Sequence, residues 1–176
     1  MDSNLIMILG VGNILMTDEG FGIRVIEELE KRYEFPENVS VVDGGVLGVS
    51  LMGVISEADR LIVVDAVRNQ NPPGTMYRIE HDEIPNRILA KNSVHQIDFL
   101  ETLTLCQALD KVPQTLILGI EPQDIDTLSI ELTPVIKEKI DRMICLVLKE
   151  LDDLGISYNK RSGDYVPRDT FKDCDY

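Results

Sequence analysis

The sequence predicts an α/β protein, a three-layer α/β/α sandwich built around a mixed five-stranded sheet. Short apolar runs rich in β-branched residues alternate along the chain with segments of helical periodicity. Such continuous runs are typical of strands buried on both faces, as in parallel sheets. One connection between strands is too short for a helical crossover, so one strand is expected to run antiparallel. A chain of 176 residues is long enough to bury a core of its own.

The five predicted strands are short and apolar. They are 4–10 (NLIMILG), 39–45 (VSVVDGG), 60–66 (RLIVVDA), 75–79 (TMYRI) and 115–120 (TLILGI). Only AVRNQNPPG separates the third run from the fourth. A parallel connection needs a dozen or more residues, so 75–79 is the predicted antiparallel strand.

The predicted helices place their apolar residues on one face. They are 21–33, 47–57, 96–109 and a last helix that begins at Pro134 and continues to Leu151. Proline suits the first turn of a helix, because it has no N–H to leave unpaired. Residues 1–155 are therefore expected to form one domain. Residues 156–176 lack periodicity and are expected to form a loosely ordered surface tail.

Charge and cysteine usage narrow the partners and the compartment. The net charge of −14 disfavours nucleic acid and anionic membranes as partners, because both would repel the chain. The N-terminal apolar run is too short for a signal peptide or a membrane span. Three cysteines, Cys106, Cys145 and Cys174, are widely spaced and include no Cys-x-x-Cys pair. This usage favours a reducing compartment, and the predicted location is the cytoplasm.

Carboxylates follow or close the first three predicted strands. Glu19 follows the first strand, Asp43 stands near the end of the second and Asp65 near the end of the third. In a right-handed β-α-β-α-β unit, the first strand lies between the other two, and ligands collect over the carboxyl ends. Like charges held close together are unfavourable unless a proton or cation relieves them. The three carboxylates therefore predict a site at this rim.

Simpler interpretations exist for the glycine-rich loop GVGNILMTDEGFG. Asp18 suits the N-cap of the following helix, and Gly10 and Gly12 suit a tight turn beside a neighbouring backbone. A dinucleotide-binding turn is disfavoured, because Leu15 stands where the third glycine would be and Asp18-Glu19 would repel a phosphate.

A histidine can complete the predicted site. His95 stands at the start of the 96–109 helix, whereas His81 lies among charged residues and is expected on the surface. A structural role for His95 is the alternative. Glu19, Asp65 and His95 would form an oxygen and nitrogen ligand set that suits nickel, zinc or manganese. The chain has neither a His-Glu-x-x-His motif nor a nucleophile elbow, so neither the zincin arrangement nor a serine nucleophile of that type is predicted.

Taken together, the motifs resemble the hydrogenase maturation endopeptidases. The matching stretches are GVGNILMTDEGFG (10–22), VVDGG (41–45), LIVVDA (61–66), PPGTM (72–76), SVHQ (93–96) and LGIEP (118–122). They cover residues 4 to about 155 in the order of the family. The resemblance implies a phosphorylase/hydrolase-like fold, a mixed sheet with one antiparallel strand between helical layers.

The resemblance also implies an activity and a site. Members of the family remove the C-terminal extension from the large-subunit precursor of nickel–iron hydrogenases after nickel insertion. By this resemblance Glu19, Asp65 and His95 engage nickel, which the precursor largely carries, and another divalent metal can substitute in the free protein. Asp43 and Glu19 are the candidate catalytic carboxylates. The alternative function is a nickel-binding chaperone or sensor module that uses the same ligands without protease activity.

Overall fold

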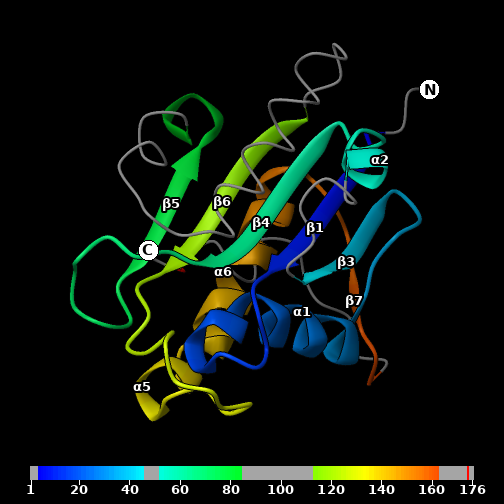
Figure 1. The fold of residues 1–176 in the computed structure, drawn as a ribbon. Helices are drawn as coiled ribbons and strands as arrows, with labels where there is room; N and C mark the ends of the chain where they lie inside the picture. The colour runs from blue at the N-terminus through cyan, green and yellow to red at the C-terminus, as the bar shows by residue number, and fades with distance from the viewer. Residues whose placement is uncertain (1–3, 46–51, 85–112, 163–173, 175–176) are drawn as a thin grey trace.

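A five-stranded mixed sheet forms the centre of the computed structural model, which describes residues 4–45, 52–84, 113–162 and 174 (Figure 1). Its strand order is β3-β1-β4-β6-β5. The strands are β1 (Ile6–Val11), β3 (Val39–Gly45), β4 (Arg60–Ala66), β5 (Met76–Glu80) and β6 (Gln114–Ile120). The first four in this order pair in parallel, and β5 pairs antiparallel with β6 at the edge. The predicted mixed sheet with one antiparallel strand is confirmed.

The first strand is the axis of the site. β1 pairs with β3 on one side and β4 on the other, as a right-handed β-α-β-α-β unit requires. In this register Gly10 lies opposite Asp43 on β3 and Val64 on β4. The carboxyl ends of the three strands therefore meet at one rim, the lower end of the sheet in Figure 1.

Helices pack on the sheet according to their apolar faces. The α-helices are α1 (Phe21–Arg32), α2 (Met52–Ile55), α5 (Pro134–Lys137) and α6 (Ile140–Asp153), and the 3₁₀ helices are η1 (Thr17–Gly20) and η3 (His81–Glu83). α1 and α6 pack against each other on one face of the sheet. The predicted 96–109 helix and the first part of the 47–57 helix lie outside the described residues.

Two apolar cores fill the two faces of the sheet. The first joins alternate strand residues such as Ile8 and Val64 to α1 and α6. The second joins the other residues of the same strands, such as Leu9, to Ile55 of α2 and to Ile84. Since successive side chains of a strand point to opposite faces, a strand with both sets buried reads as a continuous apolar run. The predicted α/β sandwich is confirmed.

Two boundary predictions need correction. The single helix predicted from Pro134 is two helices, because Lys139 N–H bonds the Ile136 carbonyl, a tight turn that separates α5 from α6. The tail predicted from residue 156 does not start there. Tyr158 is buried among Tyr33 and Phe35, and β7 (Asn159–Lys160) pairs antiparallel with β2 (Tyr33–Glu34). Aromatic packing, which carries no helical period, holds this segment.

The cysteines also differ from expectation. Cys145 of α6 and Cys174 form a disulfide across 29 residues of sequence. The Lys149 ammonium donates a hydrogen bond to the Cys174 carbonyl, 3.0 Å away, beside the same helix. The spacing of the cysteines in the sequence gave no sign of this pairing.

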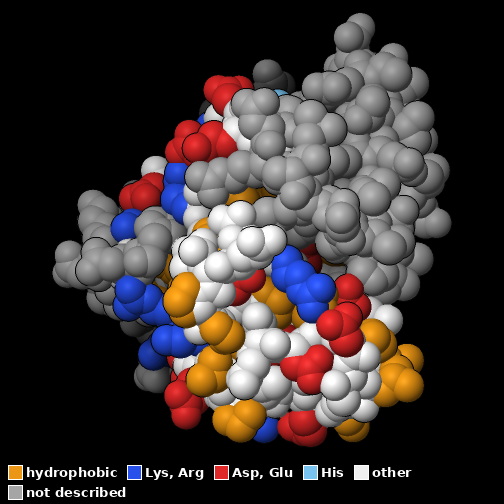
Figure 2. Space-filling model, turned by 60° about the vertical axis from the view of Figure 1, so that its left-hand side comes forward, with side chains coloured by type: hydrophobic (Ala, Val, Ile, Leu, Met, Phe, Trp, Pro, Cys, Tyr) orange, Lys and Arg blue, Asp and Glu red, His pale blue; other side chains and the backbone are white. Residues whose placement is uncertain are grey.

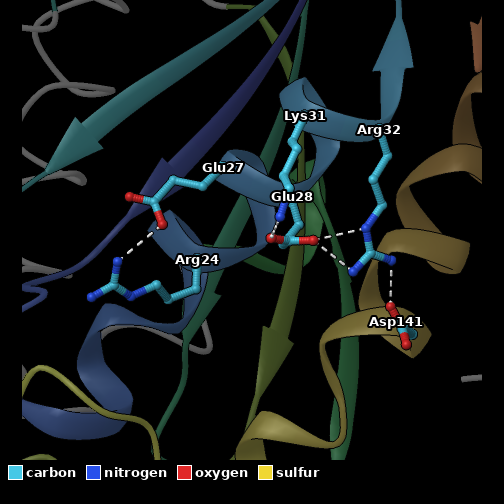
Figure 3. Close-up of polar contacts among 6 residues, drawn as sticks. All are labelled: Arg24, Glu27, Glu28, Lys31, Arg32 and Asp141. Carbon is cyan, nitrogen blue, oxygen red and sulfur yellow. Dashed lines mark hydrogen bonds and ion pairs between the residues drawn. The ribbon is translucent and has the colours of Figure 1, made fainter. Parts of the chain in front are cut away.

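The polar face of α1 carries a chain of ion pairs (Figure 3). Arg24 pairs with Glu27 at 3.0 Å, and Arg32 pairs both with Glu28 and with Asp141 of α6, each at 2.6 Å. The hydrogen bond from Arg32 holds the pKa of Glu28 below its usual value. The Arg32–Asp141 pair thus links the exposed edges of two helices that already share a core.

Among the helices of the described residues, none combines the length and the apolar character that crossing a membrane requires.

Candidate active site at the carboxyl rim of the sheet

Glycines allow the loop after β1 to fold back onto the sheet. A Cβ on Gly12 would lie 1.8 Å from the Glu19 carbonyl oxygen, and the φ of Gly12 is +135°. A Cβ on Gly22 would lie 2.2 Å from the carbonyl oxygen of Val64. Only glycine permits these approaches. The space beside these glycines is therefore filled by backbone atoms of the protein itself, which supports the tight-turn interpretation over a phosphate site.

This packing brings η1, the 3₁₀ helix that carries Glu19, against β4. Asp65 is the second-last residue of that strand. The Glu19 side chain is partly exposed, whereas Asp65 is only 9% exposed. Both residues belong to the rim that the sequence predicts. His95, the third predicted ligand, lies outside the described residues.

Asp43 occupies the same rim on the other face of the sheet. It lies level with Gly10 and Val64, which face α1, whereas Asp65 alternates with Val64 and faces the second core. The Asp43 side chain is exposed, and its Oδ1 accepts a hydrogen bond from Gly45 N–H at 2.8 Å. The predicted meeting of three carboxylates is therefore only partly right: Asp43 closes a turn across β1 from Asp65.

Asp18 has a different role from the predicted one. Neither η1 nor α1 has a side-chain N-cap bond, so the capping interpretation is wrong. The Asp18 carboxylate is fully buried and accepts hydrogen bonds from the segment that follows β6. The donors are the backbone N–H groups of Gln123, Asp124 and Thr133, at 2.7–3.0 Å, and the Thr133 hydroxyl.

Backbone bonds extend this attachment. Thr17 N–H bonds the Ser129 carbonyl at 2.9 Å, Ser129 N–H bonds the Leu15 carbonyl at 3.0 Å, and the Thr17 hydroxyl bonds the Thr127 carbonyl at 2.6 Å. Residues 13–20 and 121–133 thus form one unit, although more than a hundred residues separate them in the sequence. Asp18 stabilises the loop that carries Glu19.

Glu121 holds a second loop to the rim. Its carboxylate is buried at 4% exposure and accepts hydrogen bonds from the backbone N–H groups of Asn69 and Gln70 and from the Tyr77 hydroxyl. Burial, together with the bond to Glu121, raises the pKa of Tyr77 to about 12. Glu121 lies in the LGIEP motif, but only its position directly after an apolar strand hinted at a buried role.

Within the described ranges, no three or more His, Cys, Asp and Glu side chains gather closely enough to hold a metal ion. Because His95 is not among them, the predicted Glu19, Asp65 and His95 set stays a prediction. Glu19 and Asp65 are oxygen donors at one rim, which suits a divalent ion that brings further ligands of its own.

The fold is that of a protease family. A family model described as hydrogenase maturation protease matches residues 23–150, well over half of the chain. The chain belongs to the hydrogenase maturation protease family.

Individual relatives agree. The hydrogenase 2 maturation protease of Escherichia coli K12 is 36% identical over 170 residues, which cover 96% of this chain and 99% of the relative. The HupD hydrogenase expression/formation protein of Bradyrhizobium diazoefficiens is 40% identical over 161 residues, 90% of this chain and 84% of its own. The solved structure of the maturating endopeptidase HybD from E. coli superposes with a TM-score of 0.86 at 35% identity, covering 91% of this chain and 99% of that one.

These matches confirm the resemblance drawn from the motifs and identify the protein as an endopeptidase, a hydrolase. They favour the protease over the non-enzymatic nickel-binding alternative.

Proposed function

We propose that this protein removes the C-terminal extension from the large-subunit precursor of a nickel–iron hydrogenase once nickel has been inserted. Membership in the maturation protease family supports the class of substrate. A solved relative from Thermococcus kodakarensis, 25% identical with a TM-score of 0.70, is called a [NiFe] hydrogenase maturation protease. The proposal is supported by the packing of η1, which carries Glu19, against β4, which carries Asp65 near its carboxyl end.

The proposed recognition uses the charge of this rim. Glu19 and Asp65 are both acidic, so a cation that arrives with the substrate relieves their repulsion. With His95 they offer three ligands, which leaves coordination positions for the groups that the precursor supplies. Binding of free metal is then weaker than binding of the nickel-loaded precursor, and nickel occupancy becomes a check that insertion is complete.

A nickel ion held by Glu19, Asp65 and His95 would supply Lewis-acid polarisation of the scissile carbonyl. The residues of the chain orient the precursor and accept a proton from the attacking water. We assign the proton acceptor to Glu19, because it is partly exposed and belongs to the helix that packs on the strand of Asp65, whereas Asp43 lies across β1 from Asp65.

The cytoplasmic location stays a prediction. It is tested by measuring whether Cys145 and Cys174 are reduced or oxidised in the cell, since reduced cysteines are expected in the cytoplasm.

The first experiment compares two forms of the precursor. Purified nickel-loaded and metal-free precursor are each incubated with the protein, and the intact mass of the product is measured. The expected result is a C-terminal mass loss from the nickel-loaded form alone. Equal cleavage of both forms contradicts the metal check, and cleavage of neither contradicts the proposed activity.

Single substitutions then test the site. Glu19→Gln, Asp65→Asn and His95→Ala are expected to abolish cleavage without lowering the melting temperature by more than a few degrees. His81→Ala is the matched control, since His81, the only other histidine of the chain, accepts a bond from Thr115 N–H at the opposite end of the sheet. A cleaving His95→Ala variant with a lowered melting temperature would show that His95 is structural.

A further inference from the structure

Exposed aliphatic side chains gather at the rim that carries Glu19. The described residues contain six large hydrophobic side chains with high exposure, and five of them lie in two segments, 14–15 and 128–135. Leu128 is 78% exposed, Ile130 60% and Leu15 55%. Figure 2 shows hydrophobic side chains toward the lower end of the molecule, the end where Figure 1 draws α5 and the chain leading into it.

Four of these residues form a surface that we call the rim patch: Ile14, Leu15, Leu128 and Ile130. Met16 and Ser129 form a parallel bridge, so the segments that carry Leu15 and Leu128 lie side by side. The rim patch is thus a joint product of two distant segments.

The patch is anchored rather than loose. The buried Asp18 carboxylate and the Thr17–Ser129 bond fix the two segments, and Arg24 donates a further bond to the Ile130 carbonyl at 3.1 Å. A fixed surface loses little conformational freedom when it binds. Aliphatic groups held in water on a fixed frame are a feature of protein interaction sites.

Charge decides between the possible occupants. Neighbouring cations already have partners, since Arg24 pairs with Glu27 and Arg68 pairs with Asp126. A second copy of the chain would bring another net charge of −14 and would be repelled. The same charge disfavours an anionic membrane. A protein partner of less acidic charge with an apolar surface fits best.

Continuity with the candidate site identifies that partner. Leu15 precedes Glu19 by four residues, so the patch adjoins the segment that carries Glu19. We propose that the rim patch is the docking surface for the body of the hydrogenase precursor, so that apolar contact holds the substrate while its C-terminal segment reaches the rim. This rests on the proposed function, and it adds the surface on which the precursor is recognised.

The test is a double substitution, Leu15→Ser with Leu128→Ser, measured in the nickel-loaded precursor assay and by binding of the immobilised precursor. Removing two leucines from a contact is expected to raise KM and Kd roughly 10- to 100-fold while kcat changes less than about twofold. Leu5→Ser is the matched control, because Leu5 is 40% exposed but lies at the opposite end of the sheet. Both variants are expected to melt like the wild type.

The outcomes separate the two proposals. Wild-type protein that neither binds nor cleaves the precursor overturns the proposed function. Wild-type cleavage with an unchanged KM in the double variant overturns the docking surface alone. A wild-type dimer in sedimentation that the double variant loses also overturns it, because the patch would then join two copies of this chain.

Discussion

Acidic side chains do different work at two places in this protein. On the exposed face of α1, Glu27 and Glu28 pair with arginines and lie in water, with side-chain exposures of 51% and 27% (Figure 3). At the rim, Asp18 and Glu121 are 0% and 4% exposed and accept hydrogen bonds mainly from backbone N–H groups. The first set lies on the outer face of α1, a helix whose apolar face holds it to the core. The second set holds the loops of the candidate site in place.

Burial explains the difference. An exposed ion pair exchanges bonds with water and contributes about 0–1 kcal/mol. When a buried carboxylate is removed, water does not reach the backbone N–H groups that it accepted from. Each unsatisfied N–H group then costs about 1–3 kcal/mol of stability, and these costs do not simply add. The candidate site is therefore expected to be sensitive to side chains that never touch the substrate.

The largest effect is expected for Asp18→Ala. The substitution leaves the N–H groups of Gln123, Asp124 and Thr133 without their acceptor. The free energy of unfolding should fall by about 3–5 kcal/mol, and cleavage should fall with it as the Glu19 loop loosens. Urea denaturation measures the first. Asp18→Asn should lose less stability, because its amide oxygen still accepts a hydrogen bond. An unchanged urea midpoint in both variants would contradict the anchoring role of Asp18.

Gly12→Ala is expected to follow. The added Cβ meets the Glu19 carbonyl at 1.8 Å in a backbone conformation that disfavours side chains. A loss of about 2–4 kcal/mol is expected. Gly53→Ala is the control, since a Cβ there meets nothing within 4 Å and alanine favours the helix. The melting temperature of Gly12→Ala should fall well below that of Gly53→Ala. Similar melting temperatures would contradict the close approach of Gly12 to the Glu19 carbonyl.

Alkaline pH probes the Glu121 side of the rim. The pKa of Tyr77 is raised from 10 to about 12, so the folded state holds this proton more tightly than the unfolded chain. The stability it contributes is present below pH 10 and is lost as the pH rises toward 12, on the order of 2 kcal/mol. Tyr77→Phe should therefore flatten the decline of unfolding free energy between pH 10 and 12. A decline as steep as that of the wild type would contradict this assignment.

The smallest effect is expected on the α1 face. Arg32→Ala removes the pairs with Glu28 and Asp141 but leaves the α1–α6 core intact. The unfolding free energy should change by less than about 1 kcal/mol, and the change should shrink in 1 M salt. A loss of unfolding free energy as large as that of Asp18→Ala would contradict the claim that exposed ion pairs stabilise the protein less than the buried carboxylates do.

Elements with a local signature could be predicted closely. The strands 39–45 and 60–66 match β3 and β4 to the residue. β4 is buried along almost its whole length, as a continuous apolar run predicts, whereas β3 is an edge strand with exposed residues. The short AVRNQNPPG connection identified the antiparallel strand. Tyr158 escaped prediction because its contacts with Tyr33 and Phe35 have no period in the sequence.

The sequence alone determined the fold class and the family, and it showed that Glu19 and Asp65 stand near strand ends, because periodicity, connection length and motif spacing can be read along the chain. Tertiary structure decided that Asp18 joins two loops, that Glu121 is buried against Tyr77 and that Asp43 faces away from Asp65. Each of these depends on partners or a register set by residues far along the chain. Burial turns the same carboxylate from a solvated surface group into an anchor, and burial exists only after the distant segments have met.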